Sequence, residues 1–149
     1  MERTTTCLPI ALGDVEKQVT FREMDTDYLS GVEGVNIDEI KGYLKKGNVK
    51  VVNETIVQQR KLSDVLSENS ITEVDFVSLD VEGYELPVLQ GIDFDKVTIK
   101  CFIIENEDND EMIFKIRKYL VDRGYFLLAR LTRDDVFVHK NYFYYDDNK

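Results

Sequence analysis

Between residues 74 and 139 the sequence alternates short apolar runs with helical segments, and this alternation constrains the fold more than any other feature. Residues 74–81 and 101–104 are apolar on both faces, which is typical of strands covered on both sides in a parallel sheet. Residues 125–131 and 136–139 are two further strand candidates, and the short connection between them predicts an antiparallel hairpin. The order strand, helix, strand, helix, strand, strand predicts an α/β fold in which a parallel pair precedes that hairpin.

Three segments carry helix signals. Residues 110–123 carry the clearest one, because apolar residues recur along one face and acidic residues stand at the N-terminal end. That apolar face consists of Ile113, Ile116 and Leu120. Residues 84–90 should form a short helix that Gly91 ends. Ser63 is a suitable N-cap for another short helix through about Glu68, because its hydroxyl can accept from an otherwise unpaired N–H group.

The first 60 residues are more polar, and their strand signals are weaker. Residues 8–12 and 18–21 flank a turn signal at Gly13 and Asp14. Two short apolar runs around such a turn predict a hairpin.

The remainder of this polar region contains one strand candidate. Residues 49–57 are rich in valine and isoleucine, whose branched side chains favour extended backbone. Residues 24–48 should be mostly loop, with a helical turn at about residues 38–44. We find no internal repeat and no linker rich in proline or glycine, so the 149 residues fit one domain.

Composition limits the classes of partner. The formal net charge of −10 disfavours binding to nucleic acid or to an anionic membrane surface, both of which need basic residues. No apolar run is long enough to cross a bilayer, and the first residues do not resemble an export signal. Cys7 and Cys101 are the only cysteines, which predicts free thiols in a reducing compartment, the cytoplasm.

Acidic residues follow two of the predicted strands. Asp80 and Glu82 come after the first, and Glu105 comes after the second. Ligands of open α/β sheets bind at the carboxyl ends of strands, so we expect these three acids to share one ligand-facing edge. There a carboxylate could act as a general base, hydrogen-bond a ribose or bind a metal ion. Equally, each acid could simply cap the start of a helix.

The remaining candidate residues give weaker signals. Gly83 stands where a strand must turn into a helix, which suits close approach to a ligand or plain turn geometry. His139 has no nucleophile motif near it, so we interpret it as a structural strand residue. The cysteines lack the spacing of zinc ligands, and we assign no metal. No phosphate-binding glycine motif is present.

Residues 74–91, which contain the segment Asp80-Val81-Glu82-Gly83-Tyr84-Glu85, resemble the FkbM family of methyltransferases, whose hallmark is Asp-x-Glu-Gly-x-Glu. Three shorter segments resemble the family more weakly: residues 11–14 its third strand, residues 62–66 a short helix before the hallmark, and residues 102–105 its fifth strand. The resemblance covers most of the chain.

This resemblance implies a Rossmann-like class I methyltransferase fold, S-adenosylmethionine as the methyl donor, and O-methylation of a hydroxyl on a small molecule or sugar. Asp80 and Glu82 would lie near the transferred methyl group, with Gly83 in the cofactor-binding turn beside them. Gly13 and Asp14 would lie near the adenine. Glu105 would line the substrate side.

The chain departs from the family pattern at its N-terminal end. The family sheet begins with a strand, a glycine-rich turn and a second strand ending in an acid, yet only ten residues precede Ala11 here. We therefore expect residues 1–149 to form one incomplete sheet without the N-terminal cofactor-binding strands. The alternative hypothesis is a non-catalytic α/β remnant or interaction module that binds a partner through its open edge.

Overall fold

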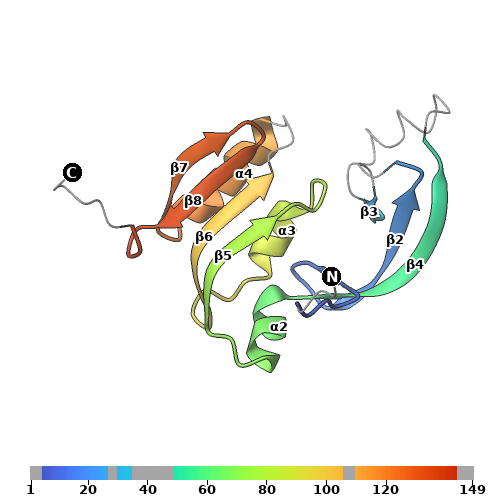
Figure 1. Cartoon of the computed structure of the whole chain (residues 1–149), viewed down its shortest axis with the longest axis horizontal. Coiled ribbons are helices and arrows are strands. Elements are labelled where there is room, and N and C mark those ends of the chain that lie inside the picture. Colours follow the sequence, from blue (N-terminus) through green and yellow to red (C-terminus); the bar gives the residue numbers. More distant parts are fainter. Residues whose placement is uncertain (1–4, 27–29, 35–48, 106–109, 144–149) are drawn as a thin grey trace.

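The computed structural model describes residues 5–26, 30–34, 49–105 and 110–143. These residues form two four-stranded sheets, and helices lie between the sheets and against one of them (Figure 1). Each sheet contains both parallel and antiparallel pairs. The chain is thus a mixed α/β fold, as the alternation of strand and helix signals predicted.

The C-terminal sheet contains the predicted alternating segments. Its strands follow the order β5 (Glu73–Leu79), β6 (Thr98–Glu105), β8 (Asp134–His139) and β7 (Tyr125–Leu131). β5 and β6 are parallel, with Leu79 opposite Ile104, and β7 and β8 form an antiparallel hairpin. The parallel pair and the closing hairpin are confirmed, although the hairpin turn is tighter than expected because β8 already begins at Asp134.

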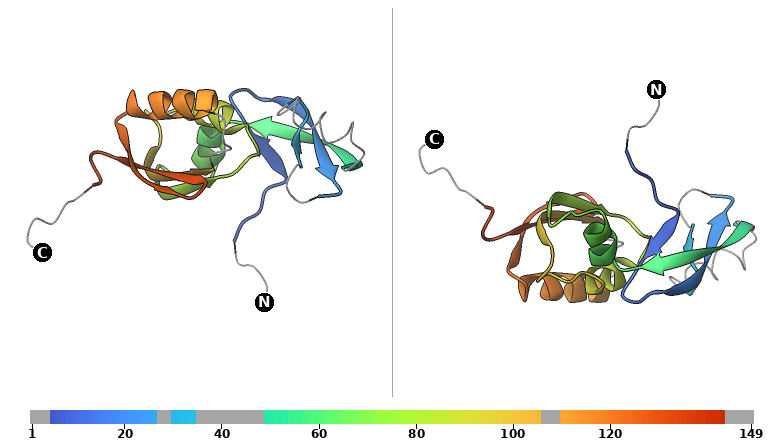
Figure 2. Two further views of the ribbon diagram at one scale, coloured as in Figure 1. Left: turned by 90° about the horizontal axis from the view of Figure 1, so that it is seen from above. Right: turned by 90° about the horizontal axis from the view of Figure 1, so that it is seen from below.

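Helices α3 (Glu85–Gln90) and α4 (Asp110–Val121) lie on one side of this sheet (Figure 2). The core forms where Leu89 and Leu120 of the helices meet Phe102 and Phe137 of the strands, and all of these side chains are fully buried. Each such burial stabilises the fold by about 1.5–3 kcal/mol. The predicted apolar face of α4 is confirmed, because its buried residues are Ile113, Ile116 and Leu120.

The prediction that the first strand is covered on both faces was wrong. β5 is an edge strand, and Phe76 on it keeps 60% of its surface exposed. β6 takes the central position between β5 and β8, as its apolar run predicted. An apolar residue pattern shows which strand faces suit burial, but it does not show whether a neighbouring strand or helix is there to cover them.

The N-terminal sheet corrects the predicted hairpin. Its strands follow the order β1 (Ile10–Leu12), β4 (Val51–Arg60), β2 (Lys17–Met24) and β3 (Gly31–Val32). The chain does reverse direction after β1, but β4 lies between β1 and β2 and pairs with both. β4 has ten residues and β1 has three, so β4 can form more hydrogen bonds with β2 than β1 could. All of β2 pairs with β4 in the antiparallel direction.

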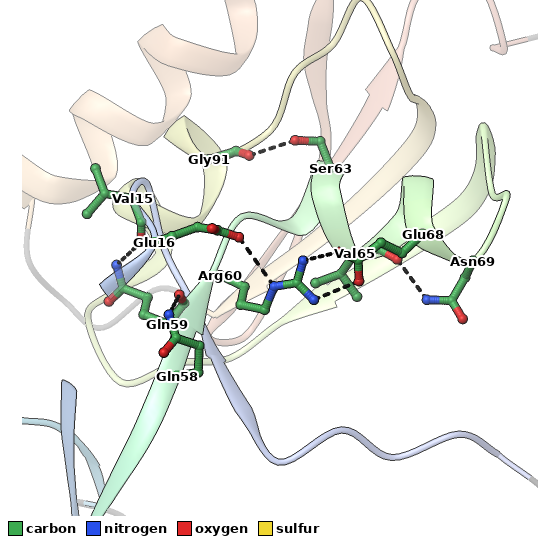
Figure 3. A network of polar contacts seen from close by, with 10 residues as sticks. All are labelled: Val15, Glu16, Gln58, Gln59, Arg60, Ser63, Val65, Glu68, Asn69 and Gly91. Atoms are coloured by element: carbon green, nitrogen blue, oxygen red, sulfur yellow. Dashed lines mark hydrogen bonds and ion pairs between the residues drawn. The ribbon is translucent and has the colours of Figure 1, made fainter. Parts of the chain in front are cut away.

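Helix α2 (Leu62–Glu68) follows β4 directly and connects the two sheets. At this junction Arg60 Nη1 donates to Glu68 Oε2 over 2.7 Å (Figure 3). The predicted helix is confirmed, but Ser63 is not its N-cap, because that position belongs to Lys61. Ser63 lies inside the first turn, is 2% exposed, and donates its hydroxyl to the carbonyl of Gly91 over 3.0 Å.

The helical turn predicted at about residues 38–44 lies outside the described residues. None of the helices in the described ranges combines the length and the apolar character needed to cross a membrane.

Candidate active site

Three carboxylates meet at the carboxyl ends of β5 and β6. Asp80 follows β5, Glu82 follows two residues later, and Glu105 is the last residue of β6. One carboxylate oxygen from each lies within 4.8 Å of the other two. Parallel pairing of β5 and β6 brings their ends to the same edge, so the expectation that these acids gather there is confirmed.

The three acids differ in exposure. Asp80 is exposed to solvent, whereas Glu82 and Glu105 are half-buried. Carboxylate oxygens so close together create a strongly negative field, which favours a cation or a hydrogen-bond donor at this point. Among the described residues, these three acids form a cluster whose spacing could suit a metal ion. Hard divalent cations bind carboxylate oxygens in this manner, but the geometry alone assigns none.

The backbone that carries Glu82 is unusual. Glu82 has a φ of 53° and Gly83 a φ of 91°, so two consecutive residues occupy the left-handed region. Glycine adopts this conformation without penalty, whereas a residue with a side chain costs roughly 1–2 kcal/mol. The turn at residues 80–84 therefore needs interactions elsewhere to hold Glu82 in place.

Glu85 supplies that support. Its side chain is 2% exposed, and its Oε1 accepts hydrogen bonds from the backbone N–H groups of Val81 (3.2 Å) and Gly83 (3.1 Å). The last acid of the hallmark segment therefore fastens the turn that bears Glu82 to the start of α3. The sequence analysis assigned Glu85 no role beyond its place in the hallmark segment; the signal for its bracing role was its position just after a glycine turn.

A cavity of about 560 Å³ lies beside this turn. One wall is formed by residues 80–82 and Tyr84, and the others by residues 8–12 and by side chains of β2, β3 and β4. The Tyr84 hydroxyl donates to Oε1 of the fully buried Gln59 over 3.2 Å, which ties the turn to the N-terminal sheet. Two of the three clustered acids, Asp80 and Glu82, therefore line a partly open space between this turn and the N-terminal sheet.

Gly13 lies in a close-packed contact. A Cβ at Gly13 would stand 2.4 Å from the Gln59 side chain, and one at Gly91 would stand 2.1 Å from the Gly13 carbonyl oxygen. Gln59 also donates to the carbonyl of Val15 over 2.9 Å, which fixes the chain on the far side of the turn (Figure 3). Gly13, Asp14 and Gly83 are not among the residues that line the cavity, and their roles in cofactor binding stay predictions.

His139 packs against neighbouring side chains, and Cys101 is half-buried. The His139 ring packs edge-to-face on Tyr125 with centroids 5.0 Å apart, and its Nδ1 accepts from the Asn141 N–H over 3.3 Å. Both fit the interpretation of His139 as a structural residue. Cys7 and Cys101 form no disulfide, and burial raises the pKa of the Cys101 thiol, so this thiol stays protonated at neutral pH.

A comparison with known protein families now identifies the chain. The methyltransferase FkbM domain matches residues 2–127. The chain belongs to the FkbM methyltransferase family. Searches of curated proteins and of solved structures give no match.

The FkbM match includes the whole acidic cluster and the turn braced by Glu85. It ends within β7, so most of the closing hairpin lies beyond it. The hallmark segment has a specific sequence pattern, contains two consecutive residues with positive φ and lines a cavity.

Proposed function

We propose that this chain carries the acidic part of the active site of an S-adenosylmethionine-dependent methyltransferase that methylates a hydroxyl oxygen on a small molecule or sugar. One observation supports this above all: the carboxylates of Asp80, Glu82 and Glu105 converge within 4.8 Å, beside a cavity, in a member of a methyltransferase family.

The donor set fits the charge of this cofactor. S-adenosylmethionine is a sulfonium cation that supplies an electrophilic methyl group, and a cluster of carboxylates complements such a positive charge. Asp80 and Glu82 would lie near its methyl group, with Gly83 in the turn beside them. The family resemblance adds Gly13 and Asp14 at the adenine.

The chain's own acids would position the acceptor and take up its proton. Methyl transfer needs an in-line arrangement and a base for a hydroxyl that is not acidic. Asp80 is the most exposed of the three acids and lines the cavity, so we assign it the general base role. Glu82 and Glu105 would orient the hydroxyl by accepting hydrogen bonds. No metal is part of this proposal.

Calorimetric titration of the chain with S-adenosylmethionine, followed by a radiolabelled transfer assay, tests the proposal. Asp80→Asn should leave folding unchanged and lower turnover by about 10²–10⁴-fold, the usual contribution of a general base. Asp122→Asn is the matched control, because it removes one carboxylate at the exposed end of α4 and should change neither quantity. Equal turnover of the wild type and Asp80→Asn would remove Asp80 from the mechanism.

The proposal extends to the type of sheet and to the cellular setting of the protein. β1 and β5 are edge strands that each have one parallel partner, which supports an incomplete sheet of the Rossmann-like class I type. The net charge of −10 and the two unpaired cysteines support a partner that is not nucleic acid and a reducing, cytoplasmic setting.

The same free edges favour the second candidate, a non-catalytic module that binds a partner by strand addition. Phe76, 60% exposed on the edge strand β5, is the observation in its favour. The calorimetric experiment separates the two: heat of S-adenosylmethionine binding to the wild-type chain supports the enzyme, and its absence at millimolar concentrations supports the module.

A further inference from the structure

The cavity beside the acids is polar on one side only. Its other walls present aliphatic and aromatic side chains, namely Leu8, Ile10, Leu12, Phe21, Val32 and Val57. Its two hydroxyl-bearing residues already have hydrogen bonds: Tyr84 donates to Gln59 over 3.2 Å, and Ser30 Oγ accepts from the Met24 N–H over 3.1 Å. Among the lining side chains, Asp80 and Glu82 are therefore the ones that can recognise a ligand by charge.

We propose that this cavity binds the methyl acceptor, and that the acceptor is an apolar alcohol rather than a sugar. This inference rests on the proposed methyltransferase function and adds the chemical class of its substrate. An apolar body would fill the space between the N-terminal sheet and the turn at residues 80–84, with a single hydroxyl directed at the carboxylates. A volume of about 560 Å³ is within the range of small-molecule sites.

The cost of unpaired polar groups decides against a sugar. A glycoside carries hydroxyls around its whole ring, and those that face Leu8, Ile10 or Val57 would find no side-chain partner there. Burying a hydroxyl without a hydrogen bond is unfavourable, so each such group lowers affinity. The adenosine and amino-acid parts of the cofactor are polar in the same way. The apolar walls therefore suit the acceptor better than the donor.

The chemistry at the carboxylates balances with an alcohol. The hydroxyl donates a hydrogen bond to Asp80, and its proton passes to that carboxylate as a lone pair of the oxygen forms the new bond to the methyl carbon. The electron pair of the broken methyl–sulfur bond stays on sulfur. The products are a neutral ether, a protonated carboxyl group and a neutral thioether, so charge and atoms are conserved.

Titration of the isotopically labelled full chain, followed by NMR of its methyl groups, tests the inference. We expect 3-phenylpropan-1-ol to shift the methyl signals of Leu8 and Val57, and methyl β-glucoside to bind at least tenfold more weakly. Equal or tighter binding of the glucoside would overturn the inference. Displacement of the alcohol from these methyl groups by S-adenosylmethionine would also overturn it, because the cavity would then be the donor site.

A pair of variants on one strand sharpens the test. Val57→Thr places a hydroxyl in the cavity wall at almost constant volume and should weaken binding of the alcohol about tenfold. Val52→Thr is the control, because Val52 lies on the same β4, is 62% exposed and does not line the cavity. Equal affinity of both variants would contradict the proposed binding mode.

This experiment separates the inference from the function on which it rests. Binding of the alcohol in the cavity without S-adenosylmethionine binding or methyl transfer would refute the proposed function and leave the cavity's ligand class intact. Methyl transfer to the glucoside and not to the alcohol would refute the ligand class and leave the function intact.

Discussion

Replacement of Glu85 tests whether the turn at residues 80–84 depends on the last acid of the hallmark segment. In Glu85→Ala, the N–H groups of Val81 and Gly83 lose the oxygen that both now bind. Glu85 is 2% exposed, so little water can take its place. Each N–H left unpaired costs about 1–3 kcal/mol, so for the two groups together we expect the free energy of unfolding to fall by about 2–6 kcal/mol. Urea denaturation followed by circular dichroism measures this change.

Glu85→Gln provides the first control. Both hydrogen bonds end on Oε1, and glutamine keeps a carbonyl oxygen that can accept them, so this variant should lose less than about 1 kcal/mol. Glu111→Ala provides the second control, since Glu111 is an exposed acid in the first turn of α4 and should lose at most about 0.5 kcal/mol. A loss that is equal for alanine and glutamine at position 85 would refute the bracing role.

Amide hydrogen exchange gives a local measurement of the same turn. The N–H of Gly83 should exchange much faster in Glu85→Ala than in the wild type, and at nearly the wild-type rate in Glu85→Gln. The exchange rates of amides in the central strand β6 should rise only as far as the loss of global stability requires. Unaltered exchange at Gly83 in the alanine variant would show that the turn is held by other contacts.

Two further substitutions test the packing around the site. Gly91→Ala places a Cβ 2.1 Å from the Gly13 carbonyl oxygen and should lower the free energy of unfolding by about 2–4 kcal/mol. In the control Gly31→Ala, the Cβ meets no atom within 4 Å, so the free energy of unfolding should stay within about 0.5 kcal/mol of the wild type. Similar denaturation midpoints for the two variants would contradict the contact at Gly91. Asp135→Ala removes a carboxylate that is 3% exposed and accepts from Arg117 Nε (2.9 Å) and Nη2 (3.1 Å). We expect a loss of about 3 kcal/mol in thermal or urea unfolding, and an unchanged midpoint would show that water replaces the pair.

The strands that carry the site could be predicted because their signals are local. The apolar run in β6 and the apolar face of α4 are each encoded within a few residues, and both predictions were confirmed. The convergence of Asp80 and Glu105 was predictable for a similar reason. Once β5 and β6 are parallel neighbours, the residues that follow them must meet at one edge.

The partners of β1 could not be predicted in this way. Its pairing with β4 joins residues that lie 48 apart in the sequence, such as Ile10 and Gln58, and no turn signal encodes such a contact. The cavity depends on this pairing, because residues 8–12 form a large part of its lining. The sequence alone therefore could not predict the apolar lining of the proposed acceptor site, because that lining combines segments that are distant in the sequence.

Burial separates the acids of the hallmark segment. Asp80 is exposed and lines the cavity, whereas Glu85 is 2% exposed and its Oε1 accepts from two backbone N–H groups. A carboxylate whose oxygen is engaged by the backbone in this way is poorly placed to accept a proton from a substrate, and an exposed one is poorly placed to brace a turn. The spacing Asp-x-Glu-Gly-x-Glu therefore combines two different requirements. The glycine and the last acid fix the left-handed turn, and that turn determines where the carboxylate of Glu82 stands relative to Asp80 and Glu105.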